Sequence, residues 1–70
     1  MTFPEKVITA RYQLGLSQEK LAAKLGVSFS TVNRWEKGHA MPSYLALDRF
    51  NALCKENNIV FKDNESWIEK

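Results

Sequence analysis

The chain has 70 residues and is poor in the residues that build specialised small proteins, with one cysteine, one histidine, three glycines and two prolines. The single Cys54 excludes an internal disulfide, and His39 has no partner at the spacing that metal ligands need. We therefore expect no metal site and no cofactor. A chain this short buries only about 60% of the surface that its unfolded form exposes, so it makes one domain with a modest core.

The sequence also lacks a signal region and a long apolar run. Its opening residues, Met-Thr-Phe-Pro-Glu, lead directly into amphipathic sequence. No stretch approaches the roughly 20 apolar residues that a membrane-spanning helix needs. We expect a soluble cytoplasmic protein with no membrane contact.

The net charge of +2 is too small to identify a partner, but the charge is unevenly distributed. Residues 1–55 contain eight Lys and Arg against four acidic residues, a net +4, whereas residues 56–70 contain two against four, a net −2. The basic character therefore lies in the first part of the chain. A solvated surface of mixed charge is the simpler interpretation of so small an excess.

Four segments combine helical periodicity with helix start and stop residues, which predicts an all-α fold. The expected helices cover about 4–14, 17–25, 28–37 and 43–57. A serine that can act as N-cap opens each of the last three. Only Gly26 and Val27 separate the second helix from the cap of the third, so we expect a tight turn there.

Residues 58–70 form a tail of uncertain structure behind a domain that covers residues 1–57. Ile59, Val60 and Phe61 favour a strand, while 64–68 can form a short helical turn. The apolar side chains of this tail either close the core or form a dimer contact. Both interpretations stay open from the sequence.

A charged residue falls among the expected buried positions of two helices. Arg11 lies within the apolar stripe of the first helix, and Glu36 lies beside Val32 and Trp35 on the third. A buried charge without a partner is strongly destabilising, and the guanidinium fork fits a carboxylate. We therefore predict that Arg11 and Glu36 pair and clamp the two helices. The alternative is that each side chain reaches solvent at the edge of its stripe.

The central part of the chain resembles the helix-turn-helix domain of phage-repressor, Cro and Xre-type regulators. The resemblance covers residues 4 to about 57 and rests on the stretch LSQEKLAAKLGVSFSTVNRWEKG, with ARYQLG before it and AMPS after it. The features that agree are Gln18, Ala22, the turn residue Gly26, the core residue Val32 and the ending Trp35-Glu36-Lys37-Gly38. The resemblance implies a compact, lambda-repressor-like bundle of four or five helices. It also implies an Arg–Glu pair between the first and third helices, which matches Arg11 and Glu36.

By this resemblance the third helix enters the major groove of double-stranded DNA and reads bases with Phe29, Ser30, Asn33 and Arg34. Arg34 can bind guanine, Asn33 can contact adenine or a phosphate, and Ser30 discriminates little. Phe29 departs from the commonly polar residue of the family. It either packs over the first turn or contacts a thymine methyl.

The expected phosphate contacts lie near helix starts and around the third helix, where backbone amides favour anions. They are Ser17, Gln18, Thr31, Lys37, His39, Ser43 and Tyr44. For a single lysine or serine, a solvated or capping role is the simpler alternative.

The resemblance implies a sequence-specific DNA-binding transcriptional regulator, and we expect a repressor. Because one module of this size buries little surface on DNA, we expect it to bind a pseudo-palindromic operator as a homodimer. No arrangement of catalytic residues is present, because Cys54 lies on an apolar stripe and His39 stands alone, so we do not expect an enzyme. A protein-interaction or scaffold module on the same fold is the alternative. Exposed apolar anchors on the third helix would favour that alternative.

Overall fold

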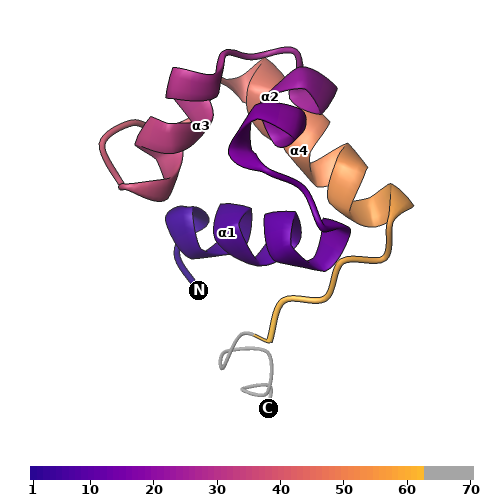
Figure 1. The fold of residues 1–70 in the computed structure, drawn as a ribbon. Coiled ribbons are helices and arrows are strands. Elements are labelled where there is room, and N and C mark those ends of the chain that lie inside the picture. Colours follow the sequence, from indigo (N-terminus) through magenta and orange to yellow (C-terminus); the bar gives the residue numbers. More distant parts are fainter. Residues whose placement is uncertain (63–70) are drawn as a thin grey trace.

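The computed structural model describes residues 1–62, which form four helices and no strand (Figure 1). They are α1 (Phe3–Leu14), α2 (Gln18–Leu25), α3 (Phe29–Glu36) and α4 (Tyr44–Glu56). The predicted all-α fold is confirmed, and the described residues contain no fifth helix. The last three helices each begin one residue later than predicted because the opening serine is the cap and not the first helical residue.

The helix starts show how short local sequences set these boundaries. Ser17, Ser28 and Ser43 each accept a hydrogen bond from the backbone N–H three residues later, at 3.1 Å. At the start of α1, Thr2 and Glu5 form a reciprocal capping box that begins the helix one residue earlier than we expected. Each of the four helices therefore has one of its free N-terminal amides satisfied by a side chain.

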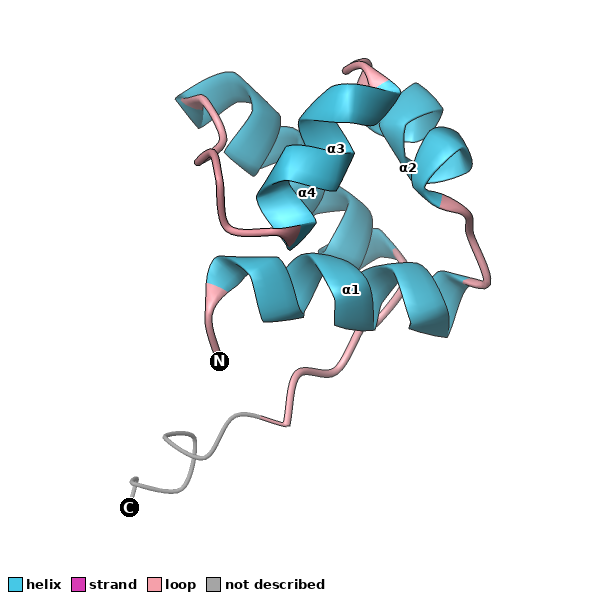
Figure 2. Cartoon of the chain, turned by 60° about the vertical axis from the view of Figure 1, so that its left-hand side comes forward, coloured by secondary structure: helices cyan, strands magenta, loops and turns pink. Residues whose placement is uncertain are grey.

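The four helices surround one core, with α3 packed on both α1 and α2 (Figures 1 and 2). The aromatic centre consists of Phe3, Trp35 and Phe50. The Phe3 ring meets the other two edge-on, with centroid distances of 5.5 Å to Trp35 and 5.4 Å to Phe50. The buried side chains of the described residues are Val7, Ala10, Leu21, Ala22, Leu25, Val32, Trp35, Ala46, Phe50 and Cys54. Because all four helices contribute, the core fixes how α3 is presented.

The turn between α2 and α3 depends on the conformational freedom of glycine. Gly26 has a φ of 72°, in the left-handed region. A Cβ at this position would lie 2.7 Å from Nη1 of Arg49 on α4, so the flexible end of that side chain would have to shift. That same nitrogen donates a hydrogen bond to the carbonyl oxygen of Leu25, at 3.1 Å. This hydrogen bond from Arg49 therefore connects α4 to the last residue of α2, directly before the turn.

The segment after α4 runs beneath α1 without forming a strand (Figure 1). Ile59 and Phe61 pack against the core. Between them, Val60 is held by the side chain of Gln13, which donates to its carbonyl oxygen at 2.7 Å and accepts from its N–H at 3.2 Å. These tail residues thus contact the core of their own chain, and a dimer contact stays a prediction. The helical turn expected at 64–68 lies outside the described residues.

Candidate nucleic-acid interface

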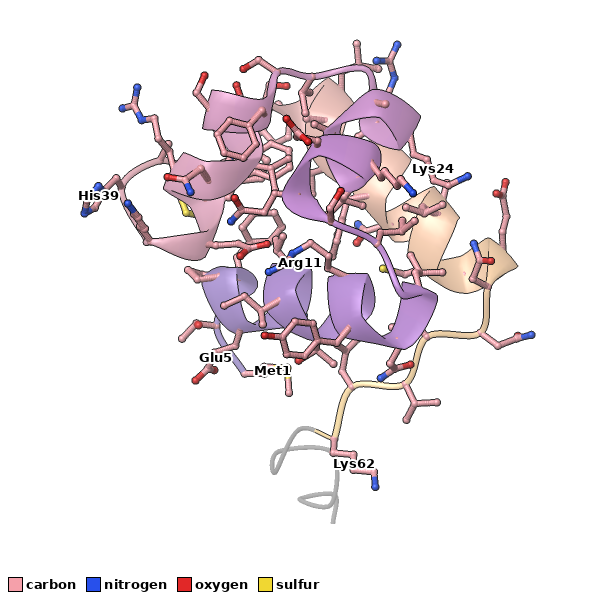
Figure 3. The ribbon with its side chains drawn as sticks, in the orientation of Figure 1. Met1, Glu5, Arg11, Lys24, His39 and Lys62 are labelled. Atoms are coloured by element: carbon pink, nitrogen blue, oxygen red, sulfur yellow. The ribbon has the colours of Figure 1, made fainter. Side chains whose placement is uncertain are left out.

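We call Val32, Trp35 and Glu36 the inner edge of α3. This edge is anchored by an ion pair with α1. Arg11 Nε lies 2.7 Å from Glu36 Oε2, and Arg11 Nη2 donates to Glu36 Oε1 at 3.1 Å. The Arg11 side chain is 17% exposed and that of Glu36 is 8% exposed. Figure 3 shows Arg11 between the two helices, reaching from α1 toward α3. The expected pairing of these two residues is therefore present in bidentate form, and not as two side chains that reach solvent separately.

This ion pair also affects Arg11 itself and the loop after α1. The hydrogen bond to Glu36 raises the pKa of Arg11, against the opposing effect of burial. Arg11 Nη1 donates in addition to the carbonyl oxygen of Leu16, at 3.3 Å. One guanidinium therefore connects α1, the following loop and the end of α3.

Gln18 extends the ion pair to α2 and back to α3, which the sequence did not indicate. Its Nε2 donates to Glu36 Oε1 at 2.9 Å, and its Oε1 accepts from Asn33 Nδ2 at 3.1 Å. We call the side chains Arg11, Glu36, Gln18 and Asn33 the polar chain. Gln18 was expected only as a phosphate ligand, and the structure assigns it these internal contacts. Its position at the start of α2 was visible in the sequence, but the contact depends on how α2 and α3 cross.

The outer edge of α3 is exposed and mostly polar. Ser30, Arg34 and Lys37 are exposed, and Asn33 is half-buried beside them. Phe29 is 48% exposed and is not among the described residues that pack on the core. The first residue of α3 thus leaves an aromatic ring accessible next to the polar side chains. We call Phe29, Ser30, Arg34 and Lys37 the outer edge.

The expected phosphate ligands are spread over the starts of three helices and the loop after α3. Ser17 and Ser43 cap α2 and α4, and the hydroxyl of Thr31 shares a hydrogen bond with Ser28 at 2.8 Å. Tyr44 is 89% exposed at the start of α4. Figure 3 shows His39 projecting outward from the loop that follows α3. The arrangement leaves the serine and threonine hydroxyls with structural roles that do not depend on a ligand.

Other kinds of site find little support in residues 1–62. Within this part of the chain there is no group of three or more His, Cys, Asp or Glu that could hold a metal. The thiol of Cys54 is buried, and burial raises its pKa, although Lys6 opposes the shift. A protonated thiol is a poor nucleophile. None of the described helices combines the length and apolar character needed to cross a bilayer.

Comparison with known proteins agrees with the geometry of α2 and α3. A family model described as helix-turn-helix matches residues 8–54. The match begins within α1 and ends within α4, so it includes the turn at Gly26 and the outer edge of α3. No significant match was found among curated proteins or among solved structures.

Proposed function

The chain belongs to the helix-turn-helix family of DNA-binding regulators, and on this premise we propose that it is a sequence-specific transcriptional repressor. The observation that carries the proposal is the contrast across α3. Its inner edge is buried and clamped to α1, while its outer edge exposes Ser30, Arg34 and Lys37. A helix held in this way enters the major groove with its exposed side chains toward the base edges.

The proposed base contacts follow from the chemistry of the exposed side chains. Arg34 presents a planar pair of donors to O6 and N7 of guanine. Phe29 packs on a thymine methyl group, which the accessibility of its ring supports. Ser30 accepts or donates to either kind of base, and Asn33 reaches the groove from its half-buried position beside them.

The proposed phosphate contacts position α3 without reading sequence. The start of α2 offers free backbone amides together with Ser17 and Gln18, and the start of α4 offers the same with Ser43 and Tyr44. Near α3, the remaining contacts come from Thr31, Lys37 and His39. Their number predicts a strong dependence of affinity on salt.

We propose a homodimer on a pseudo-palindromic operator, acting in the cytoplasm. One module of this size buries little surface on DNA, roughly 600–1,000 Å². Two modules related by a two-fold axis place two recognition helices in successive major grooves, with half-sites about one helical turn apart. This arrangement supplies the affinity that a single short helix lacks.

The scaffold interpretation receives less support from the surface of α3. A protein-binding surface is expected to centre on apolar and aromatic anchors. On the outer edge only Phe29 is apolar, and its neighbours Ser30, Arg34 and Lys37 suit base edges and phosphates. We therefore favour DNA as the partner of this surface.

Selection of bound sequences from a random double-stranded DNA pool, with the full chain, tests the proposal. We expect enrichment of two related half-sites about one turn apart. The selected duplex is then titrated between about 50 and 200 mM salt, where the affinity should fall steeply. A single half-site duplex serves as the control and should bind more weakly. Equal affinity for all sequences, or no binding at low salt, would contradict a sequence-specific regulator.

A further inference from the structure

The hydrogen bonds of the polar chain run in a fixed direction that starts from the carboxylate of Glu36, whose side chain is 8% exposed. Glu36 is paired with the Arg11 guanidinium, and a carboxylate in such a pair can only accept hydrogen bonds. Its Oε1 already accepts from Arg11 Nη2 and from Gln18 Nε2. Any amide that contacts this oxygen must therefore present its nitrogen.

This requirement fixes the orientation of Gln18. If its amide were turned by 180°, Oε1 of Gln18 would replace Nε2 at 2.9 Å from the carboxylate oxygen, and two acceptors would face each other. Because Nε2 faces Glu36, Oε1 faces Asn33 and accepts from its Nδ2, at 3.1 Å. The orientation of the second amide is thus set by the first.

This sequence of donors and acceptors determines which atoms of Asn33 and Gln18 remain free to bind a ligand. Asn33 uses Nδ2 toward Gln18, and its Oδ1 receives no hydrogen bond from the described part of the chain. Gln18 keeps one unused hydrogen on Nε2, because that nitrogen carries two and donates one to Glu36. Asn33 likewise keeps one unused hydrogen on Nδ2, which donates once to Gln18. Toward a ligand, Asn33 therefore offers an oriented acceptor beside one remaining N–H, and Gln18 offers only a donor.

We propose that Glu36, acting through Gln18, makes Asn33 a specificity-determining residue that selects a base with an exocyclic amine. The oriented oxygen accepts from N6 of adenine or N4 of cytosine and repels O6 of guanine and O4 of thymine, while the remaining N–H of Nδ2 can donate to N7 of adenine. Gln18 and Glu36 are positioning residues in this scheme, while the remaining N–H of Gln18 suits a phosphate, which only accepts. The inference rests on the proposed function, since it concerns how the same surface reads DNA.

The role of Gln18 separates this proposal from a simple phosphate contact. Without Gln18, the Asn33 amide is free to turn and can present either its oxygen or its nitrogen. At the base pair that Asn33 contacts, the ratio of affinity between the preferred bases and the other bases should then become smaller. Loss of a phosphate contact alone weakens binding to all sequences equally and leaves every base preference unchanged.

The test compares base preferences of the parent chain and of the variants Asn33→Ala and Gln18→Ala. Competition binding is measured on the selected operator with all four bases at each position of one half-site. In the parent we expect one position at which adenine or cytosine on the contacted strand binds about threefold to tenfold tighter than guanine or thymine. Asn33→Ala should abolish this ratio. Gln18→Ala should reduce it at the same position and weaken binding to all sequences.

Matched controls are Asn51→Ala on α4 and Gln13→Ala on α1, two exposed residues outside the polar chain. At every position of the half-site, both variants should show the same relative affinities for the four bases as the parent chain. A second measurement needs no DNA: in Asn33→Ala, the side-chain amide NMR signals of Gln18 should shift, and in Asn51→Ala they should not. This measurement also shows whether each variant is folded.

The outcomes separate the two proposals. If the parent binds DNA with sequence preference but Gln18→Ala leaves every base ratio unchanged, the positioning role of Gln18 is wrong and the proposed function stands. The same holds if Asn33→Ala leaves the ratios unchanged. If the parent binds no DNA, or binds all sequences equally, both proposals are overturned.

Discussion

The two edges of α3 obey different physical rules although they belong to one helix of eight residues. On the inner edge, Val32 and Trp35 are almost fully buried and the carboxylate of Glu36 is held by two other side chains. On the outer edge, Arg34 and Lys37 are exposed, and within residues 1–62 their side chains make no hydrogen bond or ion pair. The comparison indicates that the side chains that stabilise α3 are separate from those that we propose for DNA recognition on the same helix.

This separation follows from the length of α3. A helix this short is not stable alone in water, so its conformation depends on packing against neighbouring helices. The core and the ion pair to Arg11 supply that support from one side only. The outer edge is therefore free to vary in sequence without loss of the fold. The variants below test the separation, from the largest expected effect to the smallest.

Trp35→Ala should have the largest effect, because it removes the most buried large side chain of the inner edge. Trp35 is 1% exposed and meets the ring of Phe3. We expect the free energy of unfolding to fall by about 3–5 kcal/mol, enough to unfold a domain of this size in large part. Urea unfolding followed by circular dichroism measures the change. Tyr44→Ala, which truncates a residue that is 89% exposed, is the control and should change stability little. A loss below about 1 kcal/mol in Trp35→Ala would show that the cavity collapses.

Glu36→Ala should be the next most destabilising change, because it leaves Arg11 and Gln18 without their shared acceptor. We expect a loss of about 2–3 kcal/mol, less than for a fully buried pair since Arg11 is 17% exposed. The melting temperature measures it. Glu56→Ala, an exposed carboxylate at the end of α4, is the control. A double variant, Arg11→Met with Glu36→Leu, should recover part of the loss, because it strands no charge. A Glu36→Ala variant as stable as the parent would show that the pair does not support α3.

Sequence reasoning was effective on the inner edge because burial leaves a periodic pattern. The apolar stripes placed Val32 and Trp35 in the core, and the charges within those stripes required partners, which pointed to Arg11 and Glu36. The contact of Gln18 with Glu36 was missed, because polar residues at helix starts carry no comparable pattern. The capping box of Thr2 with Glu5 was also missed, although Thr-x-x-Glu before a helix is a sequence signal that could have placed the first boundary.

The outer edge could not be derived in the same way. An exposed side chain has few partners within the fold, so neither periodicity nor burial constrains its role. The expectation that Phe29, Ser30 and Arg34 contact bases came from resemblance to a family, and it stays a prediction. The exposure of the Phe29 ring illustrates the limit, because the sequence left open whether that ring packs over the first turn.

Arg34→Ala should act on the outer edge alone. We expect a loss of about 1–3 kcal/mol in binding at one guanine position, with relaxed preference there and an unchanged melting temperature. Competition binding on operators that vary at each position measures the preference. Arg49→Ala is the contrasting variant. It removes the hydrogen bond between α4 and the end of α2, so it should lower the stability of the fold. If Arg34→Ala keeps every base preference, Arg34 does not read bases.

Lys37→Gln should have the smallest effect and a different form. Lys37 is exposed at the C-cap of α3, so loss of its charge leaves the core unchanged. A phosphate contact predicts that affinity falls by a similar factor on every sequence and that the slope of log affinity against log salt decreases by about 1. Lys24→Gln is the matched control, because Figure 3 shows Lys24 on the opposite side of the molecule from His39. An equal change of slope in both variants would mean that net charge, and not a contact beside α3, controls binding. A change confined to Lys37→Gln would extend the outer edge from base recognition to the phosphate backbone.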